Sequence, residues 1–525
     1  MTMLKNIGIK RLRSLWDTDL IKIAPLTILV GKNSCGKSTW LRSFPLLSQT
    51  LQTDTNEPIL WYDRNMVDFG SFEESLSKFK NFGDTQDINF TFEVTSKRVI
   101  KPIFPYFPSS QKEYSILISK YIDKSSLTKE IIDIFDYSIE VNLKKKIIRV
   151  RIENIGFEES FGILGRIGKG FFLPTLLGQK DEKNPSLFHN VMKNKLIEFI
   201  RPNLHKSTST DTIERSLSGF HLSSINDFDN QLQKQANEAK TQSLKNFYNN
   251  LLNNKNKKNK FISLFILSSI DTILEIETRE LRSFYDNLTY IAPVRASAER
   301  YYRIQGLAIN KIDPLGINVP LYLYDLKRKR KKDYNSWTEW TRQNFGLEFD
   351  IEANFGHISL FFVDVDTQGK YNLSDVGFGY SQILPILINL WDAQNHDRNQ
   401  LSFHNMAYRK RNKTITKTIT IEQPELHLHP AMQAKLIKVF FNTIVYAKEN
   451  DIDLRIIIET HSETMINYLG RIVADCGIDG VEELINILVF NPETPEKSNI
   501  SISGFNKQGY LKNWPIGFFT PDLDI

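Results

Sequence analysis

Apolar and polar positions alternate in short runs toward both ends of the chain, and such runs predict β-strands. Residues 26–30 form an apolar, β-branched run with the length of a buried strand. Residues 137–141 and 146–151 alternate polar and apolar side chains, as the two arms of a hairpin do. Further strand-like runs cover residues 7–9, 21–23, 90–94, 288–291, 358–365, 418–421, 455–458 and 485–489. Helical patterns separate them, for example at residues 432–447, so we predict an α/β fold.

The middle of the chain, residues 155–287, has a different pattern. Its windows are rich in Lys, Asn, Gln and Leu, and the clearest helical window covers residues 225–252. We expect the Asn- and Lys-rich tract at residues 249–260 to be a loop or a helix end. Apolar heptads are not sustained, which argues against a long coiled coil. This part is therefore predicted to be a mostly helical insertion between two α/β lobes.

Charge and composition narrow the class of protein only slightly. The 525 residues carry a net charge of +6, and basic residues cluster at 255–260, 327–332 and 409–417. Such runs either contact a phosphate backbone or form solvated loops, and both readings stay open. Two cysteines give no disulfide framework, and the most apolar stretch, residues 261–276, is interrupted by Ser and Asp. We expect a soluble, cytoplasmic protein without a membrane segment.

A P-loop motif follows the first buried strand, and a helical stretch from residue 37 to about 51 follows the motif. The spacing G-x-x-x-x-G-K-[ST] places backbone N–H groups around phosphates at a helix N-terminus. The residues predicted to bind ATP here are Gly31, Lys32, Asn33, Ser34, Cys35, Gly36, Lys37, Ser38 and Thr39. Lys37 is expected to reach the β- and γ-phosphates, and the hydroxyl of Ser38 to bind Mg²⁺. Cys35 is interpreted as a small spacer.

Two later strands end in residues that suit the same chemistry. Glu422 ends one strand and is predicted to bind Mg²⁺, directly or through water. Gln423 and Glu425 follow it, and His461 follows the next strand, where it can contact the γ-phosphate or position water. A zinc cluster is the alternative for Glu422, Glu425, His427, His429 and His461. Their spacing does not match common structural zinc sites, and we expect His427 to be a core histidine.

Together, residues 33–38, 422–430 and 460–462 resemble the AAA-15/AAA-21 group of ABC-type ATPases, which includes OLD-family nucleases and PtuA ATPases. Further segments resemble the PtuA-like branch, namely residues 67–72, 290–295, 375–385 and 509–519. The resemblance implies an ABC/SMC-like P-loop NTPase head. Its N-terminal lobe is residues 1–154, its helical insertion 155–287 and its C-terminal lobe 288–525.

The resemblance also implies a second half-site for ATP. In that group two heads stack head-to-tail, and the signature segment of one head caps the ATP held by the other. Here the residues in the signature position are Gly377, Gly379, Ser381 and Gln382. Gln49 resembles the Q-loop glutamine that contacts Mg²⁺, with a surface helix glutamine as the alternative.

One position departs from the pattern of many ABC heads. A glutamate that polarises water usually follows the magnesium-binding acid, and here that position is Gln423. A neutral amide orients water but does not accept its proton. Either Glu425 or His461 takes the role of base, or hydrolysis is slow and the ATP-bound state is the signal.

The PtuA-like resemblance implies an antiphage defence ATPase of the Septu or retron type. Its partner is an HNH nuclease similar to PtuB, and some relatives also bind a reverse transcriptase and its noncoding RNA or DNA. Residues 470–525 are expected to be too short for the Toprim nuclease domain of OLD proteins. Two alternatives are a RecF- or Rad50-like DNA-repair ATPase and a transporter ATPase subunit, although the signature segment does not fit the latter.

Overall fold

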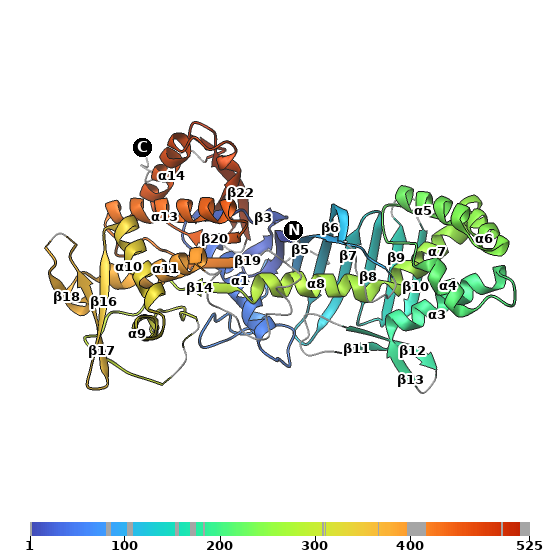
Figure 1. Cartoon of the computed structure of the whole chain (residues 1–525), viewed down its shortest axis with the longest axis horizontal. Helices are drawn as coiled ribbons and strands as arrows, with labels where there is room; N and C mark the ends of the chain where they lie inside the picture. The colour runs from blue at the N-terminus through green and yellow to red at the C-terminus, as the bar shows by residue number, and fades with distance from the viewer. Residues whose placement is uncertain are drawn as a thin grey trace.

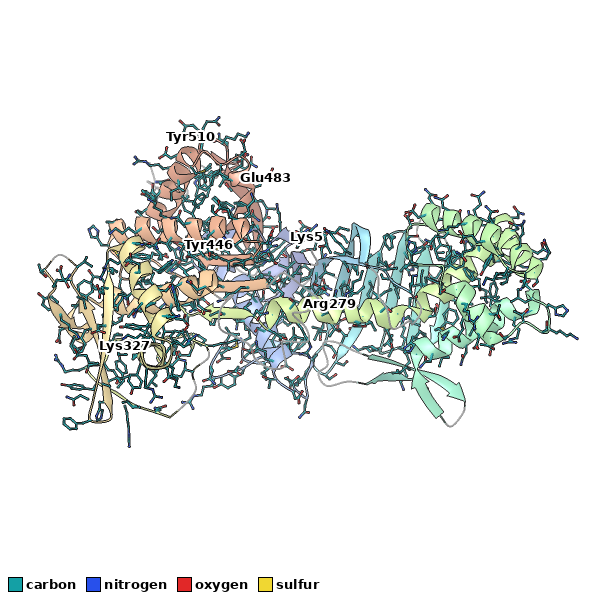
Figure 2. The ribbon with its side chains drawn as sticks, viewed as in Figure 1. Lys5, Arg279, Lys327, Tyr446, Glu483 and Tyr510 are labelled. Carbon is teal, nitrogen blue, oxygen red and sulfur yellow. The ribbon has the colours of Figure 1, made fainter. Side chains whose placement is uncertain are left out.

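The structure is a computed structural model of the chain (Figure 1). It describes residues 3–79, 86–101, 109–152, 157–167, 175–181, 184–306, 309, 311–365, 367–395, 416–494 and 497–514. The molecule is elongated, with a bundle of helices at one end and a mixed α/β region toward the other (Figure 1). A long antiparallel sheet lies between these two ends. Figure 2 shows Arg279, on the helix that spans this middle part, and Lys327 in the α/β region.

A seven-stranded sheet forms the centre of the α/β region, in the order β14-β19-β20-β4-β21-β22-β23. Its first five strands are parallel. They are β14 (Leu288–Ile291), β19 (Thr416–Glu422), β20 (Asp453–Glu459), β4 (Leu26–Gly31) and β21 (Ile485–Thr494). The hairpin of β22 (Lys497–Phe505) and β23 (Leu511–Lys512) completes the edge. The predicted α/β fold class is therefore confirmed.

Helices cover both faces of this sheet because its strands bury side chains on both sides. Along β4, Leu29 joins one hydrophobic core while Ile28 and Val30 join the other. The first core is shared with α1 (Lys37–Gln52) and α8 (Ile270–Tyr285). The second core contains the buried faces of α11 (Phe378–Asn395), α13 (Pro430–Glu449) and α14 (Glu463–Asp475).

A nine-stranded antiparallel sheet extends from the N-terminal residues, in the order β10-β9-β8-β7-β6-β5-β1-β2, with β3 also paired to β1. Its strands are β1 (Met3–Leu12), β2 (Leu15–Asp17), β3 (Ile21–Lys22), β5 (Ile88–Arg98), β6 (Ser109–Ile122), β7 (Leu127–Ile134), β8 (Tyr137–Asn142), β9 (Ile147–Ile152) and β10 (Phe157–Gly162). The predicted hairpin is confirmed as β8 and β9. Burial alternates along β8, as expected for a sheet with one face on the core.

The helical part begins later than predicted. Strand β10 and a small sheet of β11 (Gly165–Ile167), β12 (Thr175–Asp181) and β13 (Asn184–Leu187) precede it. The helices are α3 (Phe188–Ile200), α4 (Thr210–Leu217), α5 (Ile225–Glu238), α6 (Gln242–Asn253) and α7 (Lys255–Ser268), followed by α8. The composition of this part of the chain did not indicate β10, which pairs with β9 as the next strand of the antiparallel sheet.

The helical window predicted at residues 225–252 is two helices, because Thr241 caps the second one. Its side chain accepts a hydrogen bond from the backbone N–H of Leu244. Likewise, the Asn- and Lys-rich tract is a helix junction, in which Asn254 caps α7 by accepting from the N–H of Lys257. These short polar side chains satisfy backbone donors that a continuing helix would pair internally.

A second small sheet lies beyond the seven-stranded one, and it contains β15 (Tyr302–Arg303), β16 (Glu348–Asn354), β17 (His357–Val363) and β18 (Lys370–Asn372). Helices α9 (Val319–Lys329) and α10 (Lys331–Phe345) pack beside β16. In the described part of the chain, no helix combines the length and apolarity needed to cross a bilayer.

A buried ionic cluster joins α8 to the long antiparallel sheet. The ammonium of Lys120 on β6 lies 2.8 Å from Glu130 on β7 and 2.6 Å from Glu277 on α8. The side chains are at most 1% exposed. Burial raises the pKa of Glu277 well above its usual range, and the neighbouring carboxylate of Glu130 raises it further. The cluster therefore fixes α8 to the sheet through groups that have no access to water.

Removing the cation of this cluster should strongly destabilise the fold. Lys120→Met leaves two carboxyl groups buried without their counter-charge, a change that typically costs about 3–5 kcal/mol. We expect a matching loss in the free energy of unfolding, measured by chemical denaturation. Lys124→Met removes an exposed lysine in the turn between β6 and β7, whose surface pair with Glu73 contributes little to stability, and it is the control.

Removing the ionisable group on α8 should change how stability depends on pH. Because the folded-state pKa of Glu277 is raised, the folded chain holds a proton that the unfolded chain has released. Stability is therefore full below the ordinary carboxyl pKa and is lost as pH rises through the raised one. Glu277→Gln mimics the protonated form, so its unfolding free energy should fall less than that of the wild type as pH rises above the ordinary carboxyl pKa. An identical pH dependence would contradict this assignment.

Candidate nucleotide-binding site

The predicted P-loop lies between β4 and α1, where a strand ends and a helix begins. Gly36 caps α1 with φ at 89°, and a Cβ there would lie 2.7 Å from the hydroxyl of Ser14. Both the left-handed backbone and this close approach require glycine. The ammonium of Lys37 donates to the carbonyls of Gly31 at 3.0 Å and Lys32 at 2.7 Å. The loop is thus folded around its own lysine.

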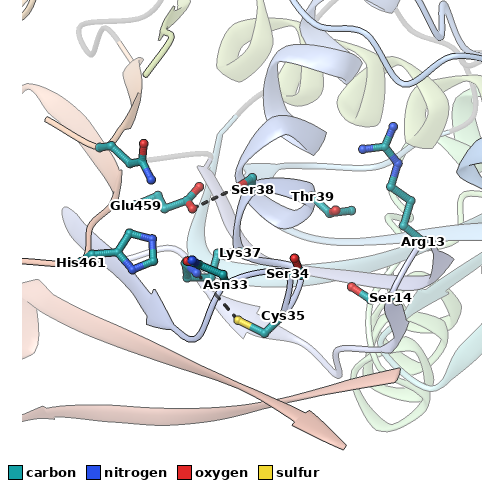
Figure 3. A pocket seen from close by; sticks show the side chains of 12 residues that line it. Arg13, Ser14, Asn33, Ser34, Cys35, Lys37, Ser38, Thr39, Glu459 and His461 are labelled. Atoms are coloured by element: carbon teal, nitrogen blue, oxygen red, sulfur yellow. Dashed lines mark hydrogen bonds between the residues drawn. The ribbon is translucent and has the colours of Figure 1, made fainter. Parts of the chain in front are cut away.

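A cavity of about 530 Å³ opens over this loop, within the usual size of ligand pockets (Figure 3). Residues 33–39 line it from the loop and the first turn of α1. Gln423, Glu459 and His461 line it from the ends of the neighbouring strands (Figure 3). The structure therefore brings the motif residues of three separate segments to one cavity.

Two further lining residues, Arg13 and Ser14, come from the turn between β1 and β2. No motif marks them in the sequence, because only the pairing of β1 with β2 carries this turn to the P-loop. The guanidinium of Arg13 lies 4.4 Å from the centre of the Phe69 ring, and burial lowers its pKa. A cation at this place favours an anionic ligand.

Cys35 behaves as the small spacer that we predicted. It is 1% exposed, and its thiol contacts the carbonyl of Lys32 at 2.8 Å. Burial raises the pKa of this thiol, so the reactive thiolate form is disfavoured at neutral pH.

Glu459, at the end of β20, directly contacts the P-loop serine. The hydroxyl of Ser38 donates to Glu459 Oε1 at 2.9 Å. Glu459 is 3% exposed, and its Oε2 has no hydrogen-bond partner among the described residues. Burial raises the pKa of Glu459 to about 7, and the nearby Glu422 carboxylate contributes to the same shift. The sequence analysis gave this residue no role.

Glu422, at the end of β19, is held by a different set of partners. The guanidinium of Arg42 donates to Oε1 at 2.7 Å and to Oε2 at 2.8 Å. The hydroxyl of Tyr290 also donates to Oε1, at 2.7 Å. The hydrogen bond to Glu422 raises the pKa of Arg42, so the guanidinium stays charged. Glu422 does not line the cavity over the P-loop.

Gln423 and the two candidate bases, Glu425 and His461, occupy three different environments. Gln423 lines the cavity with φ at 43°, and its N–H donates to the carbonyl of Glu459 at 2.8 Å. Glu425 Oε1 accepts from the backbone N–H of His461 at 2.7 Å, and burial raises the pKa of this carboxyl. Burial and the charge of Lys37 lower the pKa of His461, so its imidazole is neutral at pH 7. Glu425 thus positions His461 from outside the cavity.

The signature residues lie at the start of α11 and do not line the P-loop cavity of their own chain. Gly377 is exposed, and a Cβ on Gly379 would lie 2.7 Å from the carbonyl of His427. Ser381 is 8% exposed, and its hydroxyl donates to the carbonyl of Phe378 at 2.8 Å. The backbone of Gly377 is therefore exposed, while the hydroxyl of Ser381 is used within the first turn of α11.

Gln382 connects this helix to the end of β19. Its Oε1 accepts from the N–H of Arg295 at 3.1 Å, and its Nε2 donates to the carbonyl of Arg295 at 3.0 Å. The guanidinium of Arg295 in turn donates to the carbonyl of Glu422 at 2.7 Å. A continuous path of hydrogen bonds thus runs from the signature helix to the candidate metal-binding strand.

Gln49 does not reach the cavity. It is 1% exposed, and its amide donates to the carbonyl of Leu60 at 2.6 Å and accepts from the N–H of Val67 at 3.2 Å. Its observed role is therefore to hold the chain of residues 60–67 against α1.

The expectation of a core position for His427 is wrong. This side chain is exposed and meets the ring of Phe378 edge-on at 4.8 Å. His429 instead caps α13, where it accepts from the N–H of Ala431. No group of three or more zinc-type ligands occurs in the part of the chain that the structure describes.

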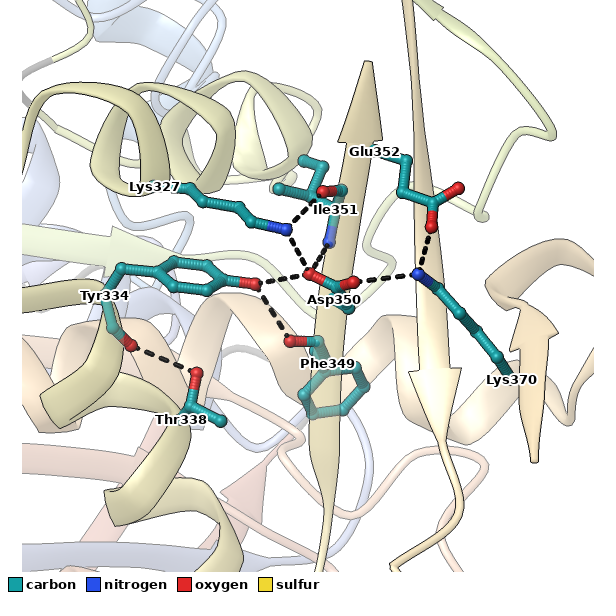
Figure 4. A network of polar contacts seen from close by, with 8 residues as sticks. All are labelled: Lys327, Tyr334, Thr338, Phe349, Asp350, Ile351, Glu352 and Lys370. Atoms are coloured by element: carbon teal, nitrogen blue, oxygen red, sulfur yellow. Dashed lines mark hydrogen bonds and ion pairs between the residues drawn. The ribbon is translucent and has the colours of Figure 1, made fainter. Parts of the chain in front are cut away.

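Acidic partners neutralise much of the predicted basic clusters. Lys327 contacts Asp350 at 2.5 Å, and Lys370 contacts the other oxygen of Asp350 at 2.8 Å (Figure 4). Lys258 pairs with Asp229 at 2.8 Å in the helical part. The run at 409–417 lies almost wholly outside the described residues. The basic runs that the structure describes are therefore partly used in ion pairs within the chain.

A glycine-rich loop between a buried parallel strand and a helix, with acidic strand ends beside it, defines a P-loop nucleotide-binding protein. The chain belongs to the AAA ATPase domain family, whose sequence profile matches residues 3–466. This match covers the P-loop, the signature segment and the strand ends that line the cavity. No curated protein matches the chain.

Solved SMC head domains are similar over nearly the whole chain. The head from Pyrococcus furiosus, with an extended coiled coil and bound to the C-terminal domain of ScpA, is 9% identical, with a TM-score of 0.35 and 96% of each chain covered. An SMC head bound to the C-winged helix domain of ScpA is 8% identical, with a TM-score of 0.38 and coverage of 95% and 98%. The Thermotoga maritima SMC head is 8% identical, with a TM-score of 0.32 and coverage of 95% and 98%. At such identities and scores, nothing about activity or partners follows.

Breaking the pair between α1 and Glu422 should destabilise the chain. Arg42→Met leaves the Glu422 carboxylate, which is 3% exposed, without its counter-charge. We expect a loss on the order of 3 kcal/mol in the free energy of unfolding. The double variant Arg42→Met/Glu422→Leu replaces the pair by apolar groups and should recover part of that loss, since the Tyr290 hydroxyl still loses its acceptor. Equal stabilities for the single and double variants would contradict this account.

Proposed function

We propose that this chain is the ATP-binding and ATP-hydrolysing subunit of an antiphage defence complex of the Septu or retron type. In this proposal two copies close on ATP, and the ATP-bound state controls a separate HNH nuclease similar to PtuB. The observation that carries the ATP-dependent part is the cavity over the P-loop, with Lys37, Ser38 and the strand-end carboxylate of Glu459 at its wall. The PtuA-like segments of the sequence support the defence role.

The residues around the cavity fit a nucleoside triphosphate with magnesium. N–H groups of the loop and the N-terminus of α1 suit phosphate oxygens. The ammonium of Lys37 donates to two backbone carbonyls and lies 3.9 Å from the sulfur of Cys35, and a phosphate oxygen can replace these neutral acceptors. An unpartnered carboxylate oxygen beside Ser38, among the described residues, suits a divalent cation. When bound, Mg²⁺ would neutralise charge on the phosphates.

The surface around the signature segment supports closure by a second copy. Gly377 and Phe378 are exposed there, and Val294 is 71% exposed on the neighbouring segment. Tyr301 and Ile317 are further exposed apolar side chains on segments that hydrogen bonds join to this one. A second copy would cover this apolar surface and place Gly377 over the ATP of the first.

Slow hydrolysis is part of the proposal, because no carboxylate occupies the place after Glu422. Gln423 orients water without accepting a proton. Glu425 is already bonded to the backbone of His461, so of the two candidate bases the neutral imidazole of His461 is the one that lines the cavity. A turnover near that of ordinary metabolic enzymes would contradict this part.

The partner nuclease is the part of the proposal that rests on the sequence resemblance, and copurification tests it directly. Expression of the chain together with its neighbouring genes should yield a complex with an HNH protein. In the retron form, a reverse transcriptase with its noncoding RNA or DNA should be present as well. Binding of DNA by the chain alone, without a partner, would instead favour the RecF- or Rad50-like alternative.

Mixing two inactive variants tests shared ATP sites. Lys37→Ala removes a charged donor and should weaken ATP binding about 10- to 100-fold, since such a hydrogen bond contributes about 1.5–3 kcal/mol. Gly377→Asp places a negative charge where the second copy's phosphate would lie. Each variant alone should lose ATPase activity. A mixture should regain roughly a quarter of the wild-type rate, because about half of the dimers contain one intact composite site.

The matched control for this experiment is Gly162→Asp, at an exposed glycine on β10 that has open space at its Cβ position. It should keep wild-type activity alone. If the mixture of Lys37→Ala and Gly377→Asp stays as inactive as either variant, ATP sites are not shared between copies.

A further inference from the structure

Two carboxylates lie side by side at the ends of neighbouring parallel strands. Glu422 of β19 and Glu459 of β20 are direct partners in the strand register. Paired residues in adjacent parallel strands point to the same face of a sheet, about 4.8 Å apart. Since β20 lies between β19 and the P-loop strand β4, Glu459 is one strand nearer to the phosphate site.

Helix α1 decides which partner each carboxylate receives. Ser38 and Arg42 are four residues apart, so they lie on one face of the helix with Cβ atoms about 5–6 Å apart. This spacing matches the distance between the two strands. Ser38 therefore meets Glu459, at 2.9 Å, while Arg42 meets Glu422, at 2.7 Å. Shifting either contact would require the helix to move across the sheet.

Both oxygens of Glu422 are already engaged by hydrogen-bond donors in this arrangement, so a metal ion would have to compete with those donors. Both oxygens accept from Arg42, and one also accepts from Tyr290. Coordinating a cation would leave the Arg42 guanidinium and the Tyr290 hydroxyl without their acceptor. The Arg42 side chain is 32% exposed and Tyr290 only 4%, so this loss is costly.

Glu459 is placed in the opposite way. It lines the cavity, it is 3% exposed, and one oxygen is already shared with the hydroxyl expected to bind magnesium. Its other oxygen has no partner among the described residues. A buried carboxylate oxygen beside a hydroxyl is the type of ligand that Mg²⁺ prefers.

We propose that Glu459, together with Ser38, binds the magnesium ion of the nucleotide complex, and that Glu422 is a positioning residue that fixes α1 through Arg42. This inference rests on the proposed nucleotide binding. It differs from the expectation drawn from the motif, which gives the metal to Glu422. The metal-binding acid thus lies on β20, directly beside the P-loop strand.

Metal binding, rather than ATPase activity, is the appropriate readout. Manganese affinity in the complex with a non-hydrolysable ATP analogue can be measured by electron paramagnetic resonance, with analogue binding followed separately without metal. Glu459→Gln should weaken manganese binding about 10- to 100-fold, the usual effect of altering a metal site. It should leave metal-free analogue binding near the wild-type value, because Gln can still accept from Ser38.

Two variants on the other strand complete the comparison. Glu422→Gln should change manganese affinity by less than about threefold, in contrast to the effect expected of a metal ligand. Tyr290→Phe removes one hydrogen bond to Glu422 without touching Glu459, and it replaces Glu422→Gln if that variant does not fold. Either variant should keep manganese affinity.

The outcomes separate this inference from the proposed function. Unchanged manganese affinity in Glu459→Gln overturns the inference, as does a loss confined to Glu422→Gln. Absence of analogue binding by the wild-type chain overturns the proposed function and the inference with it. A loss confined to Glu459→Gln supports both.

Discussion

The contact of one helix face with the ends of two parallel strands governs the geometry of the site. Through Ser38 and Arg42, α1 meets Glu459 and Glu422, and these contacts fix where the helix begins over the loop. The position of that beginning sets the direction of the N–H groups that suit phosphate. The P-loop is therefore positioned as much by the Arg42–Glu422 pair, about one helical turn along α1 and two strands across the sheet, as by its own glycines.

The same region is tied to the signature segment within one chain. Gln382 holds the backbone of Arg295, and Arg295 holds the carbonyl of Glu422. Because Gln382 and Arg295 are at most 2% exposed, these bonds are shielded from competing water. A change at the outer surface of α11 can therefore reach the end of β19 through the hydrogen bonds of Gln382 and Arg295.

Local sequence patterns predicted the parts of the fold that local forces determine. Strand β4, the P-loop and the hairpin of β8 and β9 lie where their patterns placed them, since burial periodicity and turn residues are short-range signals. The boundary of the helical part was misplaced because β10 is short, has only Phe157 and Phe161 facing the core, and depends on pairing with β9. Likewise, one polar residue, Thr241, divides a window that looked like a single helix.

In the site, too, local patterns were predictable from the sequence and long-range contacts were not. The motifs identified the loop, Gln423 and His461, all of which line the cavity. Sequence alone did not indicate Arg13, which reaches the cavity only through strand pairing, or the role of Glu459, which depends on the register between β19 and β20. For Gln49 the motif position was not informative, because its surroundings are set by the folding of residues 60–67 over α1.

Helix α8 gives the molecule a mechanical property. Its 16 residues form a rod about 24 Å long that reaches from the helical end to the seven-stranded sheet (Figure 1). The buried Lys120 cluster fastens it along the way, and the carbonyl of Tyr285 at its end accepts from Ser48 on α1. Only a few residues later, Tyr290 bonds to Glu422. A displacement of the helical end would therefore move α8 as a rigid element, and β14 and Tyr290 beside the P-loop helix would move with it.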